Sequence, residues 1–253
     1  MRISIFPLII KLVDLILDLF NYIYYLYAKL FYPNYNLPLK LKTKNKILVV
    51  LNGPSLKKQK ITNKHSTEFD MVFVNRGFIH KEYAKIKPLF HVIIDSKLIN
   101  GEWPISWIND IIILNPNVNF IFPVHWKKYP IINNLVKKNI NIHWLKTKKQ
   151  FSSLGVAGAC IEWSILLGYK EIILTGFDGN GIAYELINEK SHFYGVNSEN
   201  NKKTLRDYSL DLFSHSRFFR SLIKLNNECK RKKIKIYNAT IGGVISVFDS
   251  IKI

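Results

Sequence analysis

Two stretches decide the fold: Lys46-Ile-Leu-Val-Val-Leu-Asn-Gly-Pro-Ser55 and Leu167-Gly-Tyr-Lys-Glu-Ile-Ile-Leu-Thr-Gly-Phe-Asp178. Each contains a short apolar run of the kind that a strand buried on both faces needs, and each run stops abruptly at small and polar residues. In open α/β sheets, ligands bind beyond the carboxyl ends of the strands. The two strand ends therefore predict a ligand site.

The rest of the chain alternates between strand-like and helix-like segments. We predict strands at residues 46–51, 71–75, 90–94, 110–114, 119–122, 140–144, 170–175 and 234–237, and helices at 79–86, 129–138, 156–167 and 206–231. This β-to-α rhythm is typical of a parallel, doubly wound sheet. Segment 179–205 is polar and without clear periodicity, and we predict a long, lid-like loop there.

The composition is that of a folded protein with an unusual charge. The 253 residues are 48% hydrophobic and 22% charged, with a net charge of +19. Lysines gather between Lys40 and Lys64, and no acid follows until Glu68. Such a field attracts nucleic acid, acidic headgroups or a phosphorylated substrate, although a compositional bias of the gene would also enrich lysine. Cys160 and Cys229 have neither metal spacing nor a disulfide pattern, which favours a reducing compartment.

Residues 1–37 form a segment of their own, ahead of a predicted catalytic domain at 38–253. Residues 3–31 are mostly Ile, Leu, Phe and Tyr, and the polar ones recur at helical spacing on one face: Lys11, Asp14, Asp18, Asn21, Tyr25 and Lys29. Charges in mid-segment argue against a membrane span, and no small-residue cleavage site follows. We predict an amphipathic helix in the membrane interface. A helix docked on the protein's own core, and then a true span, remain alternatives.

Two strand ends carry residues suited to a nucleotide. In Asn52-Gly-Pro-Ser-Leu56, Gly53 permits close backbone approach, Pro54 can begin a helix, and free N–H groups can hold a phosphate. The loop is neither a G-x-G-x-x-G fingerprint nor a Walker loop, and by itself it is an ordinary turn. Asn75, after the second strand, can pair with a ribose or a base edge.

Later motifs add a helix start and an imidazole. Ser152-Ser-Leu-Gly-Val-Ala-Gly-Ala159 opens an apolar helix whose small residues either pack tightly on the sheet or leave room for a ligand at a positive helix end. Asp178 ends its strand in a turn that faces the site. His192, within Ser191-His-Phe-Tyr-Gly195, suits proton transfer near neutral pH, although a lone loop histidine is more often structural.

Taken in order, these motifs resemble the bacterial sialyltransferases of glycosyltransferase family 42. The resemblance spans residues 46–245 and is weakest at 96–150. The segment Ile236-Tyr-Asn-Ala-Thr-Ile-Gly-Gly243 is also similar to the related motility-associated flagellin glycosyltransferases. The resemblance implies an α/β fold with a doubly wound, Rossmann-like, mostly parallel sheet of a GT-A-like variant. The residue patterns add the N-terminal amphipathic helix and the lid-like loop.

The resemblance also implies roles for individual residues. Asn52, Gly53, Ser55 and Asn75 would hold the cytidine monophosphate (CMP) part of a donor, and Ser152 and Ser153 would line the nucleotide pocket. His192 would be the general base and Tyr184 would contact the leaving phosphate. The chain departs from the family pattern where Gly179 replaces a second tyrosine after Asp178, and where Asp95 replaces an asparagine in the donor site.

The expected reaction is transfer of a sialic acid or a related keto-sugar (a nonulosonate or Kdo) from its CMP ester to a cell-surface glycan such as lipo-oligosaccharide. A leaving group with one phosphate needs little neutralisation, which helix N-termini, tyrosines and lysines can supply. With no Asp-x-Asp at a strand end, we expect neither a metal nor another cofactor. The expected location is the cytoplasmic face of the bacterial inner membrane. The sequence leaves open whether the chain forms a homo-oligomer.

Two other functions compete with this one. A pterin pyrophosphokinase-like enzyme would need a divalent metal, for which the chain shows no paired carboxylates at strand ends. A basic nucleic-acid-binding protein would need exposed aromatics interleaved with its charges. Most aromatics here lie inside apolar runs, so we expect no nucleic-acid partner.

Overall fold

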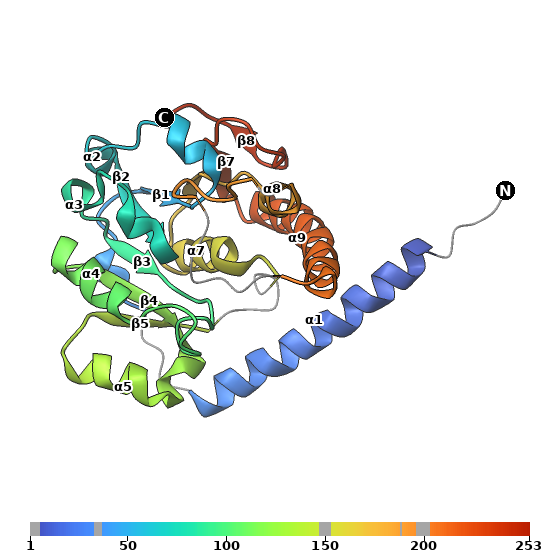
Figure 1. Cartoon of the computed structure of the whole chain (residues 1–253), viewed down its shortest axis with the longest axis horizontal. Coiled ribbons are helices and arrows are strands. Elements are labelled where there is room, and N and C mark those ends of the chain that lie inside the picture. The colour runs from blue at the N-terminus through green and yellow to red at the C-terminus, as the bar shows by residue number, and fades with distance from the viewer. Residues whose placement is uncertain (1–5, 33–36, 147–152, 188, 196–202) are drawn as a thin grey trace.

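The computed structural model describes residues 6–32, 37–146, 153–187, 189–195 and 203–253. Within them lies one eight-stranded sheet of order β5-β4-β3-β2-β1-β6-β7-β8, and all its neighbouring pairs are parallel (Figure 1). The strands are β1 (Lys46–Val50), β2 (Phe69–Val74), β3 (Phe90–Val92), β4 (Asn119–Pro123), β5 (Ile142–Leu145), β6 (Glu171–Thr175), β7 (Lys235–Asn238) and β8 (Asp249–Ser250). The predicted α/β fold class is confirmed.

Helices cover both faces of the sheet (Figure 1). The α-helices are α1 (Phe6–Phe31), α2 (His65–Glu68), α3 (Tyr83–Ile86), α4 (Ser106–Leu114), α5 (Pro130–Lys137), α7 (Gly155–Leu166), α8 (Gly181–Leu186) and α9 (Leu205–Arg231). Short 3₁₀ turns are η1 (Leu39–Leu41), η2 (Pro54–Lys58), η3 (Asn75–Ile79) and η4 (Val124–Lys128). Turn η3 directly follows β2, and η2 follows β1 after three residues, so the backbone tightens where the motifs predicted a site.

The alternation of side chains along β1 divides the core in two. Ile47 and Val49 belong to a cluster that includes Trp163 of α7 and Leu225 of α9. Leu48 and Val50 belong to the opposite cluster, with residues of α4 and α5. Parallel sheets need both faces covered, because each strand is apolar on both sides.

The winding of the chain places a switch point between β1 and β6. From β1 the chain moves outward strand by strand to β5, then returns through α7 to β6 on the other side of β1. The ends of the two strands are joined by backbone bonds, from Leu51 N to Thr175 O at 2.9 Å and from Gly53 N to Gly176 O at 2.9 Å. Ligands of doubly wound sheets bind at this point, which lies between the two motifs that open the sequence argument.

One predicted strand is wrong. Residues 110–114 form the second half of α4, not a strand. Trp107, Ile108 and Ile111 are buried on one side of this helix, while Ile113 is 77% exposed. Packing of that apolar side outweighs the strand preference of the isoleucines. The remaining predicted strands lie within a few residues of observed ones, α4 and β8 were not predicted as such, and α8 lies inside the predicted loop.

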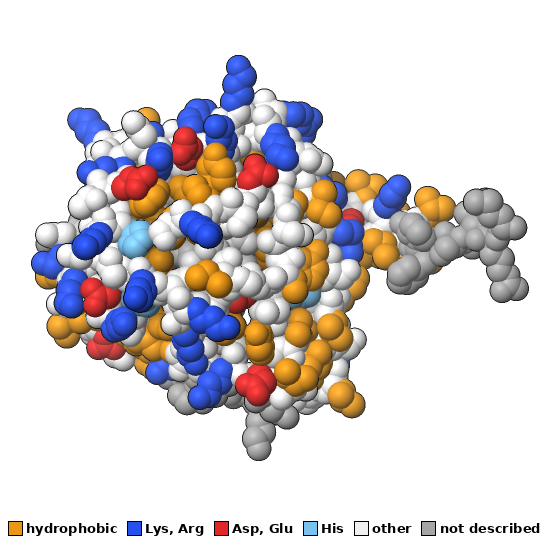
Figure 2. Space-filling view, turned by 90° about the horizontal axis from the view of Figure 1, so that it is seen from above, with side chains coloured by type: hydrophobic (Ala, Val, Ile, Leu, Met, Phe, Trp, Pro, Cys, Tyr) orange, Lys and Arg blue, Asp and Glu red, His pale blue; other side chains and the backbone are white. Residues whose placement is uncertain are grey.

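Helix α1 runs beside α9, and its first half projects beyond the body of the protein (Figure 1). Hydrophobic side chains occupy much of the projecting part (Figure 2). In the described ranges, no helix is both long and apolar enough to cross a membrane.

Candidate active site

A cavity of about 290 Å³ opens at the switch point. Four of the residues predicted from the sequence line it: Asn52, Gly53, Asp178 and His192. The loop after β1, the loop after β6, the first turn of α7 and the inner side of α9 all contribute to its wall. Segments that lie far apart in the sequence thus meet at one point.

Ser55 and Asp178 lock the loops after β1 and β6 together. The Ser55 backbone N–H donates to Oδ1 of Asp178 at 3.1 Å, and its hydroxyl donates to Oδ2 at 2.7 Å. Burial raises the pKa of Asp178, and the two hydrogen bonds from Ser55 oppose that rise. A Cβ atom on Gly53 would lie 1.8 Å from Oδ2 of Asp178 and 2.5 Å from the Gly176 carbonyl oxygen. Only glycine fits between the two loops, and the Ser55 and Asp178 side chains serve to hold them.

Hydrogen bonds from buried side chains hold the backbone of Asn75 at the end of β2. Asn75 has a left-handed backbone with φ of 45°, which is uncommon for a residue with a side chain. Its carbonyl accepts from Nε2 of His91 at 2.8 Å, while the Tyr83 hydroxyl lies 2.9 Å from Nδ1. Burial lowers the pKa of His91 to about 4. The imidazole is therefore neutral, with its proton on Nε2, and Tyr83 donates to Nδ1.

The side chains of the two asparagines differ in their bonding. Nδ2 of Asn52 donates to the Val74 carbonyl at 3.2 Å, which ties the first strand end to the second. Oδ1 of Asn75 is buried and, among the described residues, accepts no hydrogen bond. Because buried polar atoms are nearly always satisfied, this oxygen suits a ligand that brings a donor.

The turn that carries His192 is fastened to the loop after β1. Phe193 N donates to the Asn52 carbonyl at 3.0 Å. His192 and Gly195 exchange backbone hydrogen bonds of 3.3 and 3.0 Å, which close the turn. The imidazole stacks on Tyr194, with ring centres 5.0 Å apart and an interplanar angle of 27°. His192 is therefore held at the cavity by backbone and ring contacts together.

The surroundings of His192 favour its neutral form. Burial is the main cause that lowers its pKa, and Lys203 and Lys97 lower it further. Glu185 and the Asn52 carbonyl act in the opposite direction. A neutral imidazole at a cavity can accept a proton near neutral pH.

The other predicted site residues, including Ser55 and Asn75, are not among the described residues that line this cavity. Asp95 accepts from Lys97 N at 3.1 Å beyond β3. Tyr184 lies half-buried on α8, which begins at the cavity with Gly181. The Ser153 hydroxyl donates to Ser221 Oγ of α9 at 2.7 Å, and Ser152 lies outside the described residues.

Sequence reasoning missed His215 and Phe218, which α9 brings to the cavity. Nδ1 of His215 lies 3.1 Å from the Asp211 carbonyl oxygen, one turn back along the helix. The signal was present in the periodicity, because His215 shares a helix face with Phe218, Leu222 and Leu225.

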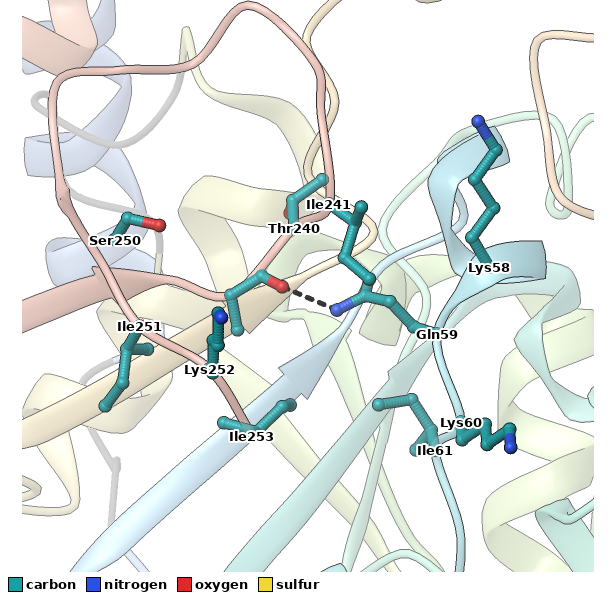
Figure 3. Close-up of a pocket in the computed structure, with 11 residues that line it drawn as sticks. Lys58, Gln59, Lys60, Ile61, Thr240, Ile241, Ser250, Ile251, Lys252 and Ile253 are labelled. Atoms are coloured by element: carbon teal, nitrogen blue, oxygen red, sulfur yellow. Dashed lines mark hydrogen bonds between the residues drawn. The ribbon is translucent and has the colours of Figure 1, made fainter.

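A larger cavity of about 470 Å³ lies between η2 and the final residues of the described chain (Figure 3). Gln59 occupies its floor, where its amide donates to the Ala239 carbonyl at 2.5 Å and accepts from Thr175 Oγ1 at 2.6 Å. Lys58 and Lys60 extend away from that hydrogen bond (Figure 3). None of the predicted site residues lines this cavity.

Neither the family models nor the curated proteins that were compared match this chain. Among solved structures, it is similar in fold to the sialyltransferase CstII from Campylobacter jejuni. For the CstII structure with the substrate analogue CMP-3FNeuAc, the identity is 17% and the TM-score 0.48. The match covers 81% of this chain and 85% of that one. For the complex of sialyltransferase CST-II with a trisaccharide acceptor and CMP, the identity is 18% and the TM-score 0.47. That match covers 81% of this chain and 85% of the other. These values describe the arrangement of helices and strands alone.

Proposed function

We propose that this chain is a glycosyltransferase that binds a CMP-activated sugar in the switch-point cavity. The observation that carries the proposal is the hydrogen bond from Phe193 N to the Asn52 carbonyl. It brings the imidazole of His192 to the wall that Asn52 and Gly53 form. The loop after β1 and a candidate base thereby face one cavity. The N–H groups of Gly53, Ser55 and Leu56, which the sequence predicted to be free for a phosphate, already donate within the protein.

The size of the cavity and the helix start beside it suit a mononucleotide. Its volume of about 290 Å³ lies just below the range of about 300–1,000 Å³ that is usual for ligand pockets. Residues of the first turn of α7 line it, and helix N-termini favour anions. Asn75 does not itself line the cavity, but its neighbour Val74 does. We propose that the buried, unpaired Oδ1 of Asn75 accepts from the amino group of cytosine or from a ribose hydroxyl. The net charge of +19 draws such a ligand in.

The chemistry that follows needs little beyond positioning and one base. The bond from the anomeric carbon to the phosphate oxygen breaks, its electron pair leaves with CMP, and the sugar becomes oxocarbenium-like. The acceptor oxygen then bonds to the anomeric carbon while neutral His192 takes the proton of the acceptor hydroxyl. Tyr184, on the helix that begins at the cavity, is the proposed contact of the leaving phosphate. In the part of the chain that the structure describes, no three His, Cys, Asp or Glu side chains gather as metal ligands. We propose a metal-independent reaction on chemical grounds, because a leaving group with one phosphate needs little charge neutralisation.

The donor sugar that we propose is a sialic acid or a related keto-sugar, and the acceptor is a cell-surface glycan such as lipo-oligosaccharide. This part rests on the motif resemblance, and so does a role in lipopolysaccharide biosynthesis at the cytoplasmic face of the inner membrane.

A donor screen tests the proposal. Purified protein is incubated with CMP-sialic acid, CMP-Kdo and UDP-sugars, with glycan acceptors and excess chelator, and products are detected by mass spectrometry. We expect transfer from a CMP-sugar that survives the chelator. His192→Gln should lose the transfer by about a hundredfold or more and keep CMP binding.

Absence of transfer from every CMP-sugar would contradict the proposal, as would a His192→Gln variant with the wild-type rate. Chelator sensitivity would favour the pyrophosphokinase alternative. A melting temperature that rises with oligonucleotides but not with CMP would favour the nucleic-acid alternative.

A further inference from the structure

Helix α1 turns its polar side toward the protein. Asp14 and Ala28 are buried, and Asp18, Asn21 and Tyr25 are half-buried. These positions recur every three to four residues, so they form one side of the helix. A helix on the surface of a soluble domain normally does the reverse, with its apolar side inward and its charges outward.

Two arginines of α9 neutralise the acids of α1. Nε and Nη2 of Arg220 donate to the two carboxylate oxygens of Asp14 at 2.8 and 2.9 Å. Nη2 of Arg217 donates to Asp18 Oδ1 at 3.0 Å. The hydrogen bond from Arg220 is the main cause that holds the pKa of Asp14 below its ordinary value. Such two-point pairs fix orientation as well as distance, so α9 determines which side of α1 faces outward.

The outer side of α1, which we call the outer face, is apolar along its whole described length. At 100° per residue its side chains span about 200° of the helix circumference. Its large apolar members are Leu8, Ile9, Leu12, Leu15, Ile16, Leu19, Phe20, Tyr22, Ile23, Tyr24, Leu26, Tyr27, Leu30 and Phe31, all exposed. The exposed charges of α1 are two lysines, Lys11 and Lys29, near its two ends. An exposed apolar surface of this extent marks an interaction site.

The width and charge of the outer face favour lipid over a second copy of the chain. Packing against one partner helix covers an apolar stripe of about 100°. That is half of the roughly 200° that the outer face spans, whereas acyl chains can surround the full width of the face. Tyr22 and Tyr27 supply amphipathic rings for the headgroup level, whereas Tyr24, at the edge of the outer face, packs edge-on against His125. Lys146 lies near both Lys127 and Lys29. Burial is the main cause that lowers the pKa of Lys146, and the charges of these two lysines lower it further. That basic cluster at one end of the face is complementary to anionic headgroups.

We propose that the outer face of α1 docks on an anionic lipid bilayer, with the helix lying in the plane of the interface. Its 26 residues would extend for about 39 Å along the membrane. Lysines at both ends can direct their ammonium groups to the headgroups while their stems lie along the apolar surface. The acids stay out of the lipid because α9 holds them.

Docking would also orient the candidate site. His215 and Phe218 line the cavity, and Arg217 and Arg220 of the same helical turns hold α1. The cavity and the outer face are thus separated by little more than α9 and α1, each about 10 Å across. A docked α1 would therefore place the cavity near the membrane surface, where the acceptor would be a glycan carried on a membrane lipid. This assignment of the acceptor class rests on the proposed function. The docking itself does not depend on that function.

Vesicle sedimentation tests the docking. The full chain is mixed with vesicles of phosphatidylcholine alone or with phosphatidylglycerol, over a series of salt concentrations. The test variant changes Leu12, Ile16, Leu19 and Ile23 to Gln, which forms helices about as well as Leu. The control variant makes the same change at four exposed apolar residues outside α1: Leu39, Ile113, Val136 and Ile241.

We expect wild type and control to sediment with the anionic vesicles, and the test variant to lose this binding by about tenfold or more. Salt should weaken the binding. Thermal unfolding of each protein reports whether it is folded, independently of any activity. Equal vesicle binding by the test variant would overturn the proposal. The proposal would also be overturned if the wild type bound neither vesicle type. A wild type that dimerises instead, with a monomeric test variant, would be one such result.

Discussion

Gly53 is the residue at which the two halves of the candidate site touch. Its φ of −61° is open to any residue, so the need for glycine is steric. Gly53→Ala should lower the free energy of unfolding by about 1–3 kcal/mol, because the new methyl group forces the Asp178 loop away. Urea unfolding measures this loss, and calorimetry should show weaker CMP binding.

Gly181 offers a matched control at the same cavity. A Cβ atom there meets nothing within 4 Å, and Gly181 begins α8. Gly181→Ala should therefore leave stability unchanged or slightly improved. Equal losses in the two variants would show that Gly53 has no special place in the loop contact.

The pH dependence of transfer reports the state of His192. Its pKa lies below the ordinary value of 6.5, with burial as the main cause. The base form therefore persists to lower pH than in a free histidine, and kcat/KM should fall only below pH 6.5. A pH–rate profile of wild type measures this acid limb. A limb at or above pH 6.5 would contradict the assignment of His192 as the base.

Residue identity in this site could be predicted only in part. The sequence motifs name Asn52, Gly53, Asp178 and His192, which line one cavity. Motifs do not show that Ser55 and Asp178 bond each other across 123 positions. Nor do they show that His91 holds the Asn75 carbonyl. Such pairs depend on how the elements pack, and a local pattern does not contain that information.

At the level of elements, the pairing of α1 with α9 depends on the contact between Asp14 and Arg220. A double-mutant cycle with Asp14→Asn and Arg220→Gln should give a coupling of about 1–2 kcal/mol in the free energy of unfolding, because the pair is two-pointed and mostly buried. The surface pair of Glu82 and Lys85 is the control, with about 0.5 kcal/mol or less. Equal couplings would show that α1 is not held by this contact.

The elements differ in how far the sequence determines them. Strands β1 and β6 are continuous apolar runs that end at glycine or asparagine, and they lie within one residue of their predicted bounds. The run at 110–114 looks the same locally but packs as a helix, because Trp107 and Ile108 continue its buried side. Helix α1 has the predicted polar stripe, yet only the structure shows that Asp14 and Asp18 of that stripe face α9.

Over the whole molecule, the winding of the sheet explains why distant motifs converge. β1 is the one strand at which the chain changes direction across the sheet, and the loops after β1, β2 and β6 therefore emerge side by side. Buried apolar residues on both faces hold these loops in place. The order β5-β4-β3-β2-β1-β6-β7-β8 could not be predicted from the sequence. Apolar runs of similar length do not show which strand pairs with which.

The central claim is that the switch-point cavity holds CMP, and calorimetric titration tests it most directly. Wild type should bind CMP more tightly than UMP or AMP, and His192→Gln should bind it nearly as well. Asn75→Gly removes the unpaired Oδ1 and suits the left-handed backbone, so it should keep the stability and lose about tenfold or more in CMP affinity. No heat of binding with CMP, or an Asn75→Gly variant that binds CMP like wild type, would contradict the account.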